Sequence, residues 1–305
     1  MDNDSKIFVA GSNGLVGSAI KKTLEDRNYN HVYWVRRKTC DLTSRIDVES
    51  YFSQSKPEYV FLSAAKVGGI GVNIEQPAEF LYDNLMIQAN IIDAAYRHGV
   101  KKLLFFGSAN TYPEDSLKPI TEDSLLSGRL EKATEPYAIA KIAGLKLCET
   151  YRKQYGCNFI AVQPSNVYGP TREPRGHVIA TLLDKFHKAK VNNEPSVTCW
   201  GSGVARREFI YADDIADASI FLMQNYDECD IINIGSGEEI SIFDLASKIA
   251  SVVGYEGTIE WDRSKPDGIL TKLLDNTKLS NLGWTPSTSL DEGLKLTYQR
   301  YTQEN

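Results

Sequence analysis

The feature that most restricts the fold of this chain is a glycine-rich segment near its N-terminus. A short apolar run, Ile7 to Ala10, leads directly into Gly11-Ser12-Asn13-Gly14-Leu15-Val16-Gly17, and a helical pattern then continues to about Arg27. Glycines permit a tight turn and bring backbone N–H groups close to a pyrophosphate, while the helix N-terminus supplies partial positive charge. We therefore predict a dinucleotide-binding loop, to which we assign Gly11, Asn13, Gly14, Leu15, Val16 and Gly17.

Apolar runs and helical patterns alternate through the first half of the chain. We predict strands at 7–10, 31–35, 59–62, 103–106 and 159–162, separated by helices such as 79–98 and 137–155. Strands that are apolar throughout are typical of a parallel sheet covered on both faces. The alternation predicts right-handed crossovers and an α/β fold with a doubly wound parallel (Rossmann) sheet.

The second half has a more mixed pattern. Short apolar segments alternate there with helices predicted at 178–190, 213–224, 242–253 and 290–301. We expect residues 1–170 to form the dinucleotide-binding domain and residues 171–305 a smaller, mixed α/β substrate domain. The exact boundary is left open, because later segments of such chains can return to the dinucleotide-binding domain.

Composition and charge exclude several classes of protein. The net charge of -6 argues against a nucleic-acid partner, because phosphate backbones require clustered Lys and Arg. The five cysteines are scattered without a CxxC pair, which indicates reduced thiols, and the four histidines show no metal-binding spacing. Neither a signal peptide nor an apolar run of the ~20 residues that span a bilayer is evident. We expect a cytoplasmic protein with no metal and no membrane partner.

The residues after the second predicted strand indicate which cofactor is bound. An acidic residue there would bond the ribose hydroxyls of NAD. The sequence reads Trp34-Val35-Arg36-Arg37 instead, and a guanidinium suits a 2′-phosphate, so we predict NADP(H) bound through Arg36. Arg37 has the simpler explanation of a solvated surface charge. Asp41 and Leu42 follow where the adenine is expected to lie.

A Tyr-xxx-Lys pair, Tyr137 and Lys141, begins the predicted helix after Pro136. The i,i+4 spacing places both side chains on one helix face. We expect the lysine ammonium to lower the pKa of the phenol toward neutrality, which would make Tyr137 a general acid for a carbonyl that receives hydride. Ser108 follows the fourth strand and can hydrogen-bond the same oxygen. These three residues are the predicted catalytic trio.

Together these elements resemble the extended short-chain dehydrogenase/reductase family and, within it, the GDP-L-fucose synthases. The resemblance covers nearly the whole chain and includes the segments 64–69, 135–149 and 164–170. It implies NADPH-dependent chemistry on a GDP-linked 4-keto sugar, with Ser108, Tyr137 and Lys141 as the catalytic residues. It also implies a homodimer formed through the helices at 79–98 and 137–155.

The family's binding residues carry over to matching positions. Ala64, Ala65 and Lys66 match the cofactor site, and Asn166 matches a sugar-binding position beside the nicotinamide. The residues that match positions around the GDP moiety are Lys185, Trp200, Arg207 and Lys272. Lys185 stands where an arginine is usual, which turns a bidentate phosphate contact into a point charge. For Trp200 a core or edge aromatic is an equally good interpretation.

The sequence departs from the family at the residues that epimerise the sugar. Epimerisation beside a ketone needs groups that remove and return a proton, in this family a cysteine and a histidine. His177 matches the histidine, but Asn110 stands at the cysteine, and an amide cannot exchange the proton. We predict that the reductase is kept, that the epimerase is lost or reduced, and that His177 binds substrate or is a remnant. Asn13 likewise replaces an arginine that helps to hold the 2′-phosphate, which leaves more of that task to Arg36.

The predicted function is NADPH-dependent reduction of the C4 keto group of a GDP-linked deoxyhexose or heptose, destined for a surface polysaccharide such as a capsule. The nearest alternative is a bifunctional GDP-L-fucose synthase, the 3,5-epimerase/4-reductase. A 4,6-dehydratase needs an acid–base pair that Ala109-Asn110 does not supply. A 4-epimerase recycles NAD, which Arg36 disfavours. A non-catalytic NADP-binding protein is the remote alternative.

Overall fold

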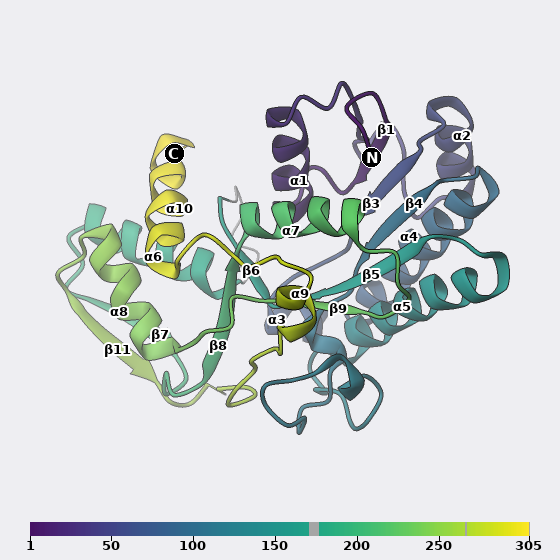
Figure 1. Ribbon diagram of the computed structural model, residues 1–305. Helices are drawn as coiled ribbons and strands as arrows, with labels where there is room; N and C mark the ends of the chain where they lie inside the picture. Colours follow the sequence, from purple (N-terminus) through teal and green to yellow (C-terminus); the bar gives the residue numbers. More distant parts are fainter. Residues whose placement is uncertain (171–176, 266, 305) are drawn as a thin grey trace.

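The computed structural model describes residues 1–170, 177–265 and 267–304. A large parallel sheet flanked by helices occupies one side of the molecule, and smaller strands with further helices lie beside it (Figure 1). Residues 171–176, where the predicted substrate domain begins, lie outside the described residues.

The large sheet has six parallel strands in the order β2-β1-β3-β4-β5-β9. Their bounds are β1 Lys6–Ala10, β2 His31–Tyr33, β3 Tyr59–Leu62, β4 Lys102–Phe106, β5 Phe159–Pro164 and β9 Ile232–Ile234. The strand order reverses between β1 and β3, which defines a doubly wound sheet. The predicted fold class is confirmed.

Helices cover both faces of this sheet. Ile7 and Val9 of β1 pack toward α1 (Leu15–Asp26) and α7 (Ala212–Asn225). On the opposite face, Phe8 and Ala10 belong to a second core with residues of α2 (Arg45–Ser55), α4 (Pro77–Arg97) and α5 (Glu135–Tyr155). Because successive strand residues point to opposite faces, one apolar strand supplies both cores.

The other strands form two small sheets. β10 (Glu239–Ser241) pairs antiparallel with β8 (Arg206–Tyr211), which pairs parallel with β6 (Asn166–Tyr168). β7 (Ser196–Trp200) pairs parallel with β11 (Thr258–Asp262). A third core joins these strands to α6 (Val178–Val191), α8 (Ile242–Val253) and α10 (Leu290–Glu304). The remaining helical elements are α3 (Ile70–Glu75), α9 (Thr277–Asn281) and the 3₁₀ turns η1 (Ala109–Thr111) and η2 (Glu122–Ser124).

The chain returns to the large sheet after residue 170. β9 pairs with β5, and α7 packs against α1, although both elements lie in the second half of the sequence. A division at residue 170 into a dinucleotide-binding and a substrate-binding domain therefore remains our proposal, with β9 and α7 rejoining the first unit.

Three properties of the described part of the chain concern membranes, metals and disulfides. No helix there is long and apolar enough to cross a membrane. In the same ranges, no group of three or more His, Cys, Asp or Glu side chains is placed to hold a metal ion. Cys40, Cys148, Cys157, Cys199 and Cys229 are free thiols.

Candidate active site

The glycine-rich loop lies at the carboxyl end of β1, where the strand order reverses. Gly11 has φ 96°, and a Cβ atom there would lie 2.6 Å from the backbone nitrogen of Ala64 in the loop after β3. A Cβ atom on Gly17 would overlap the carbonyl oxygen of Gly11. Only glycine fits a left-handed position under such close contact. The two glycines therefore let α1 and the Ala64 loop close around the end of β1.

The N-terminus of α1 has the properties of a phosphate site. Gly14 is the N-cap residue, its N–H donates to the carbonyl of Gly11 at 2.9 Å, and no side chain caps the helix. The first turn, which includes Leu15 and Val16, contains no acidic residue. Backbone N–H groups at an uncapped helix start bind anions. Asn13 lies exposed in the same turn, and these residues fit the pyrophosphate of a dinucleotide.

The loop after β3 is held by a buried asparagine that sequence reasoning missed. Asn84 of α4 is 2% exposed. Its Oδ1 accepts the Lys66 N–H at 2.9 Å, and its Nδ2 donates to the Lys66 carbonyl at 3.0 Å. These two bonds fix Ala64, Ala65 and Lys66 beside Gly11. Asn84 is a polar residue on the apolar face of the helix, and this pattern is the signal in the sequence that indicates it.

The segment after β2 places Arg36 at the surface. The Arg36 N–H donates to Thr39 Oγ1 at 3.2 Å, and the same hydroxyl donates to the Arg36 carbonyl at 2.9 Å. Asp41 accepts two bonds from Thr43, which hold the pKa of its carboxyl below the usual value. The Leu42 carbonyl accepts a bond from Asn90 Nδ2 at 3.1 Å. An exposed guanidinium beyond β2 suits a cofactor phosphate that lies along the strand ends.

Ser108 directly follows β4 and is fixed by the neighbouring strand. Its N–H donates to Oε1 of Gln163 at 2.5 Å, and Gln163 is fully buried on β5. The Ser108 hydroxyl accepts the Asn110 N–H at 3.2 Å and is hydrogen-bonded to Tyr137. Sequence reasoning missed Gln163, although a polar residue within an apolar strand was its visible sign. The structure thus brings Ser108 and Tyr137 together.

Tyr137 and Lys141 lie one turn apart on α5, as their spacing predicts. Lys141 is buried, and its Nζ lies 5.9 Å from the Tyr137 ring centre. That ammonium donates to the carbonyl oxygen of Phe106 at 2.7 Å. The three predicted catalytic residues therefore surround the end of β4.

The protonation of this pair differs from the expectation. Burial raises the pKa of Tyr137 to about 12, and the hydrogen bond to Ser108 only partly opposes it. Burial lowers the pKa of Lys141 to about 7. The expected fall of the Tyr137 pKa toward neutrality is therefore wrong for the protein without ligand, because desolvation of the buried phenol favours its neutral form. The neutral phenol at pH 7 is still the form that donates a proton.

Asn110, which we expect at the position of the family cysteine, has an unexpected partner. Its Oδ1 accepts a hydrogen bond from Lys272 Nζ at 2.9 Å. Lys272 is 8% exposed, and burial lowers its pKa to about 8. The expected contact between Lys272 and the GDP moiety stays a prediction. In the structure its ammonium bonds Asn110, whose N–H donates to the Ser108 hydroxyl.

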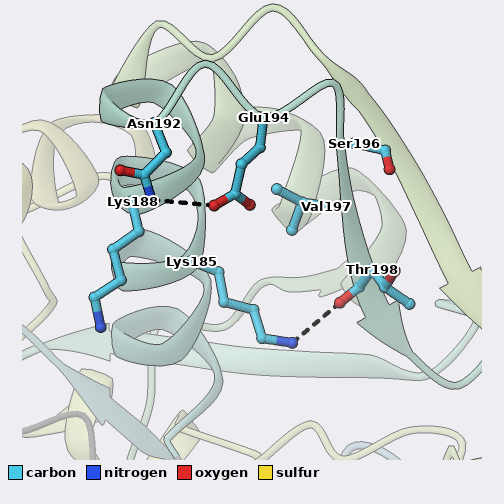
Figure 2. Close-up of a pocket in the computed structure, with 7 residues that line it drawn as sticks. All are labelled: Lys185, Lys188, Asn192, Glu194, Ser196, Val197 and Thr198. Atoms are coloured by element: carbon cyan, nitrogen blue, oxygen red, sulfur yellow. Dashed lines mark hydrogen bonds between the residues drawn. The ribbon is translucent and has the colours of Figure 1, made fainter.

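Lys185 lines a pocket of about 400 Å³ between α6 and β7, with Lys188, Asn192, Glu194, Ser196, Val197 and Thr198 (Figure 2). Its Nζ donates to the Thr198 carbonyl at 3.0 Å. Trp200 continues the exposed face of β7, and its indole is 66% exposed with Lys265 Nζ 5.5 Å from the ring centre. A core position for Trp200 is excluded, and a flat base could stack on it.

The remaining predicted site residues come from three other elements. Asn166 on β6 donates through Nδ2 to the Glu208 carbonyl at 2.8 Å. Arg207 on β8 donates to the Ile269 carbonyl at 2.5 Å, and burial lowers the pKa of its guanidinium. His177 is exposed and is the N-cap residue of α6.

The sequence profile of the NAD dependent epimerase/dehydratase family matches residues 7–235, and the chain belongs to this family. GDP-L-fucose synthase 1 of Arabidopsis thaliana is 50% identical over 303 residues, which cover 98% of this chain and 94% of that protein.

Two solved structures from Campylobacter jejuni are also similar. A GDP-6-OMe-4-keto-L-xylo-heptose reductase has a TM-score of 0.95 and 36% identity, covering 100% of this chain and 99% of that one. A GDP-mannoheptose C4 reductase with NADP bound has a TM-score of 0.93 and 38% identity, covering 99% of each chain. The predictions of an extended short-chain dehydrogenase/reductase, of an oxidoreductase and of NADP as cofactor are confirmed.

Proposed function

We propose that this protein is an NADPH-dependent C4 reductase of a GDP-linked 4-keto sugar, a deoxyhexose or a heptose, with little or no epimerase activity. The observation that carries the reductase is the cluster of Ser108, Tyr137 and Lys141 at the end of β4. Relatives named as GDP-L-fucose synthase and as GDP-heptose reductases support the class of substrate. The reduced sugar would then be incorporated into a surface polysaccharide.

The residues present fit an NADP cofactor. The uncapped N-terminus of α1 would hold the pyrophosphate, and Arg36 would hold the 2′-phosphate. Ala64, Ala65 and Lys66 would line its path across the strand ends. Bound NADPH supplies the hydride that reduces C4 of the sugar.

The side chains of the trio complete the reduction. Ser108 orients the C4 oxygen through its hydroxyl, and Tyr137 donates its proton to the alkoxide as it forms. Because the pKa of Tyr137 is about 12, the phenol is protonated at neutral pH and ready to donate. Lys141, one helical turn away, stabilises the phenolate that remains.

Substrate binding would divide between two regions. Lys185 lines the α6–β7 pocket (Figure 2), and Trp200 is the last residue of β7; these two side chains would bind the nucleotide. Asn166, Arg207 and Lys272 would lie closer to the sugar and its diphosphate, in line with their contacts around β6, β8 and η1.

The absence of epimerase activity rests on Asn110. Removal of the proton at C3 or C5 requires a base, and the carboxamide of Asn110 has no titration in water. Inversion at these carbons needs removal of a proton on one face and its return on the other, and we assign neither step to His177. In this proposal His177 contacts the substrate.

Solvent deuterium tests this proposal. The enzyme is incubated in D₂O with GDP-4-keto-6-deoxymannose and without NADPH, and C3 and C5 are observed by NMR. We expect no deuterium at either carbon, together with NADPH oxidation by a GDP-4-keto sugar of suitable configuration. Deuterium at C3 or C5 would show that the epimerase is retained.

The second candidate is a bifunctional GDP-L-fucose synthase. The 50% identity to the Arabidopsis protein favours it. It would require proton transfer by His177 alone or by a group that replaces Asn110. The deuterium experiment separates the two candidates directly.

We also propose a homodimer formed through α4 and α5. These helices pack against each other and carry large apolar side chains toward solvent: Tyr82, Tyr96, Ile139 and Tyr155. Exposed aromatic and aliphatic groups on neighbouring helices are typical of subunit interfaces.

A further inference from the structure

Lys272 belongs to the C-terminal half of the sequence but lies at the reacting end of the site. Its Nζ donates to Asn110 Oδ1, and the Asn110 N–H donates to the Ser108 hydroxyl. That hydroxyl is hydrogen-bonded to Tyr137. Asn110 therefore contacts the Lys272 ammonium through its side-chain oxygen and the Ser108 hydroxyl through its backbone N–H. By contrast, Lys185 bonds Thr198 on β7.

Charged groups from several elements face Lys272. The negative charge of Glu131, in the segment before α5, raises the Lys272 pKa. The positive charges of Arg207 on β8 and Lys118 in the loop after η1 lower it. A Cβ atom on Gly268 would lie 3.3 Å from Arg207 Nη2 and 3.9 Å from Glu131 Oε1. The ammonium thus lies in a crowded, largely dehydrated cluster in which a small change of charge alters its protonation.

The carboxamide of Asn110 is well suited to hold this ammonium. An amide oxygen accepts a hydrogen bond from Nζ without neutralising the charge, whereas a thiol is a weak acceptor. A carboxylate would bind the ammonium as an ion pair. An ammonium has three donors, so it can bind Asn110 and a substrate oxygen together.

We propose that Asn110 is a positioning residue that holds Lys272 Nζ against an oxygen of the sugar in the bound keto-sugar nucleotide. The contact would lie at the reacting sugar and not at the diphosphate or the base. This inference rests on the proposed function, and it gives the residue that replaces the family cysteine a role in binding substrate.

Steady-state NADPH oxidation with a GDP-4-keto sugar tests the proposal. Asn110→Ala and Lys272→Met should each raise KM for the keto sugar about tenfold, the usual effect of losing a hydrogen bond to a charged group. The Kd of GDP, which lacks the sugar, should change less than about twofold by the same reasoning. Binding of NADPH, measured by fluorescence, verifies that each variant is folded.

The pH profile supplies a readout that a purely structural role would not change. The wild-type KM should rise above pH 8, because the Lys272 pKa is about 8 and the neutral amine binds an oxygen acceptor more weakly. Asn110→Asp should move this rise to higher pH, since a carboxylate favours the ammonium. Gln299→Glu, the same change of amide to acid at an exposed position on α10, should leave the rise where it is.

Two results would overturn the role of Asn110. One is a KM–pH profile in Asn110→Asp that coincides with that of the wild type. The other is a loss of GDP affinity equal to the rise in KM, which would place Lys272 on the diphosphate. A wild-type protein that oxidises no NADPH with any GDP-4-keto sugar would instead overturn the proposed function itself.

Discussion

Burial controls the protonation of Tyr137 and Lys141. It raises the pKa of the phenol and lowers that of the ammonium, so that both groups favour their neutral forms. A neutral phenol suits a reduction, because the reaction consumes a proton at the C4 oxygen. The charge of Lys141 is needed only once Tyr137 has become a phenolate.

Removal of the Tyr137 hydroxyl should therefore abolish most turnover. Tyr137→Phe should lower kcat about 10³-fold, within the range for loss of a general acid. NADPH binding should persist, since the ring remains in place. Stopped-flow NADPH oxidation measures the effect, and Tyr155→Phe at the exposed end of α5 is the matched control. An active Tyr137→Phe enzyme would contradict the proposed mechanism.

Lys141 should reduce stability at neutral pH. Its pKa is about 7 in the folded protein and 10.5 without burial, so the unfolded chain binds the proton more tightly. The free energy of unfolding is lowered by the full amount below pH 7, and this loss becomes smaller as the pH rises toward 10.5. Lys141→Met should thus stabilise the protein at pH 7 by about 1–2 kcal/mol, after allowance for the lost bond to Phe106.

Thermal melting of the unliganded protein measures this effect. The melting temperature of Lys141→Met should exceed that of the wild type by a few degrees at pH 7, and the difference should shrink at pH 10. Lys146→Met, an exposed position on the same helix, should show neither change. A variant that melts below the wild type at pH 7 would contradict the prediction.

Residues that a motif defines by type and spacing are those whose proximity could be predicted from the sequence, while their catalytic role stays a prediction. Ser108, Tyr137 and Lys141 were chosen in that way, and the structure brings them together. Gln163 and Asn84 were missed because their partners are backbone groups distant in sequence. The Tyr137 pKa was predicted in the wrong direction because the sequence does not report burial.

At the scale of elements, the turn between β1 and α1 can form only because neighbouring backbone segments approach each other very closely. Gly11 contacts the Ala64 loop, and Gly17 contacts Gly11. The loop can therefore cradle a pyrophosphate only while both positions lack a side chain.

Gly17→Ala should displace α1 from the loop. A Cβ atom at this position overlaps the Gly11 carbonyl, so we expect a loss of about 2 kcal/mol in stability. The Kd for NADPH should rise at least about tenfold, the equivalent of 1.4 kcal/mol. Chemical denaturation and cofactor titration measure the two effects. Gly71→Ala in α3 is the control, because no atom lies within 4 Å of its added Cβ; equal effects in both variants would contradict the packing explanation.

Element boundaries were predicted best for the buried parallel strands. The predicted strand 59–62 coincides with β3, and 103–106 differs from β4 by one residue. β6 and β10 were missed, since each has three residues and no apolar run of its own. The helix α2 was also missed, because only Val48 and Phe52 of its residues are buried. Short or mostly exposed elements are stabilised by tertiary contacts that a local pattern does not contain.

At the scale of the whole molecule, the exposed face of α4 and α5 determines assembly in our proposal. Tyr82 is 61% exposed on this face, and Tyr155 stacks on Tyr96 with ring centres 4.2 Å apart. A symmetric partner would cover the same patch on both subunits.

Light scattering tests the proposed dimer. The wild-type protein should have twice the 34.1 kDa mass of one chain. Tyr82→Glu should shift the equilibrium toward the monomer, because it places a charge in an apolar interface. Ile46→Glu, at an exposed position on α2, should leave the mass unchanged. A monomeric wild type would show that this face has another role.

The return of β9 and α7 to the large sheet has a consequence for protein synthesis. Ile7 and Val9 on β1 share their core with Ile215 of α7 and Ile234 of β9. When a ribosome has released only the first five strands, one face of the nascent sheet still presents its apolar residues to the cell. At roughly 5–20 residues/s, several seconds of translation separate the completion of β5 from the emergence of β9. During that interval the unfinished chain offers a binding surface to chaperones that the complete protein no longer has.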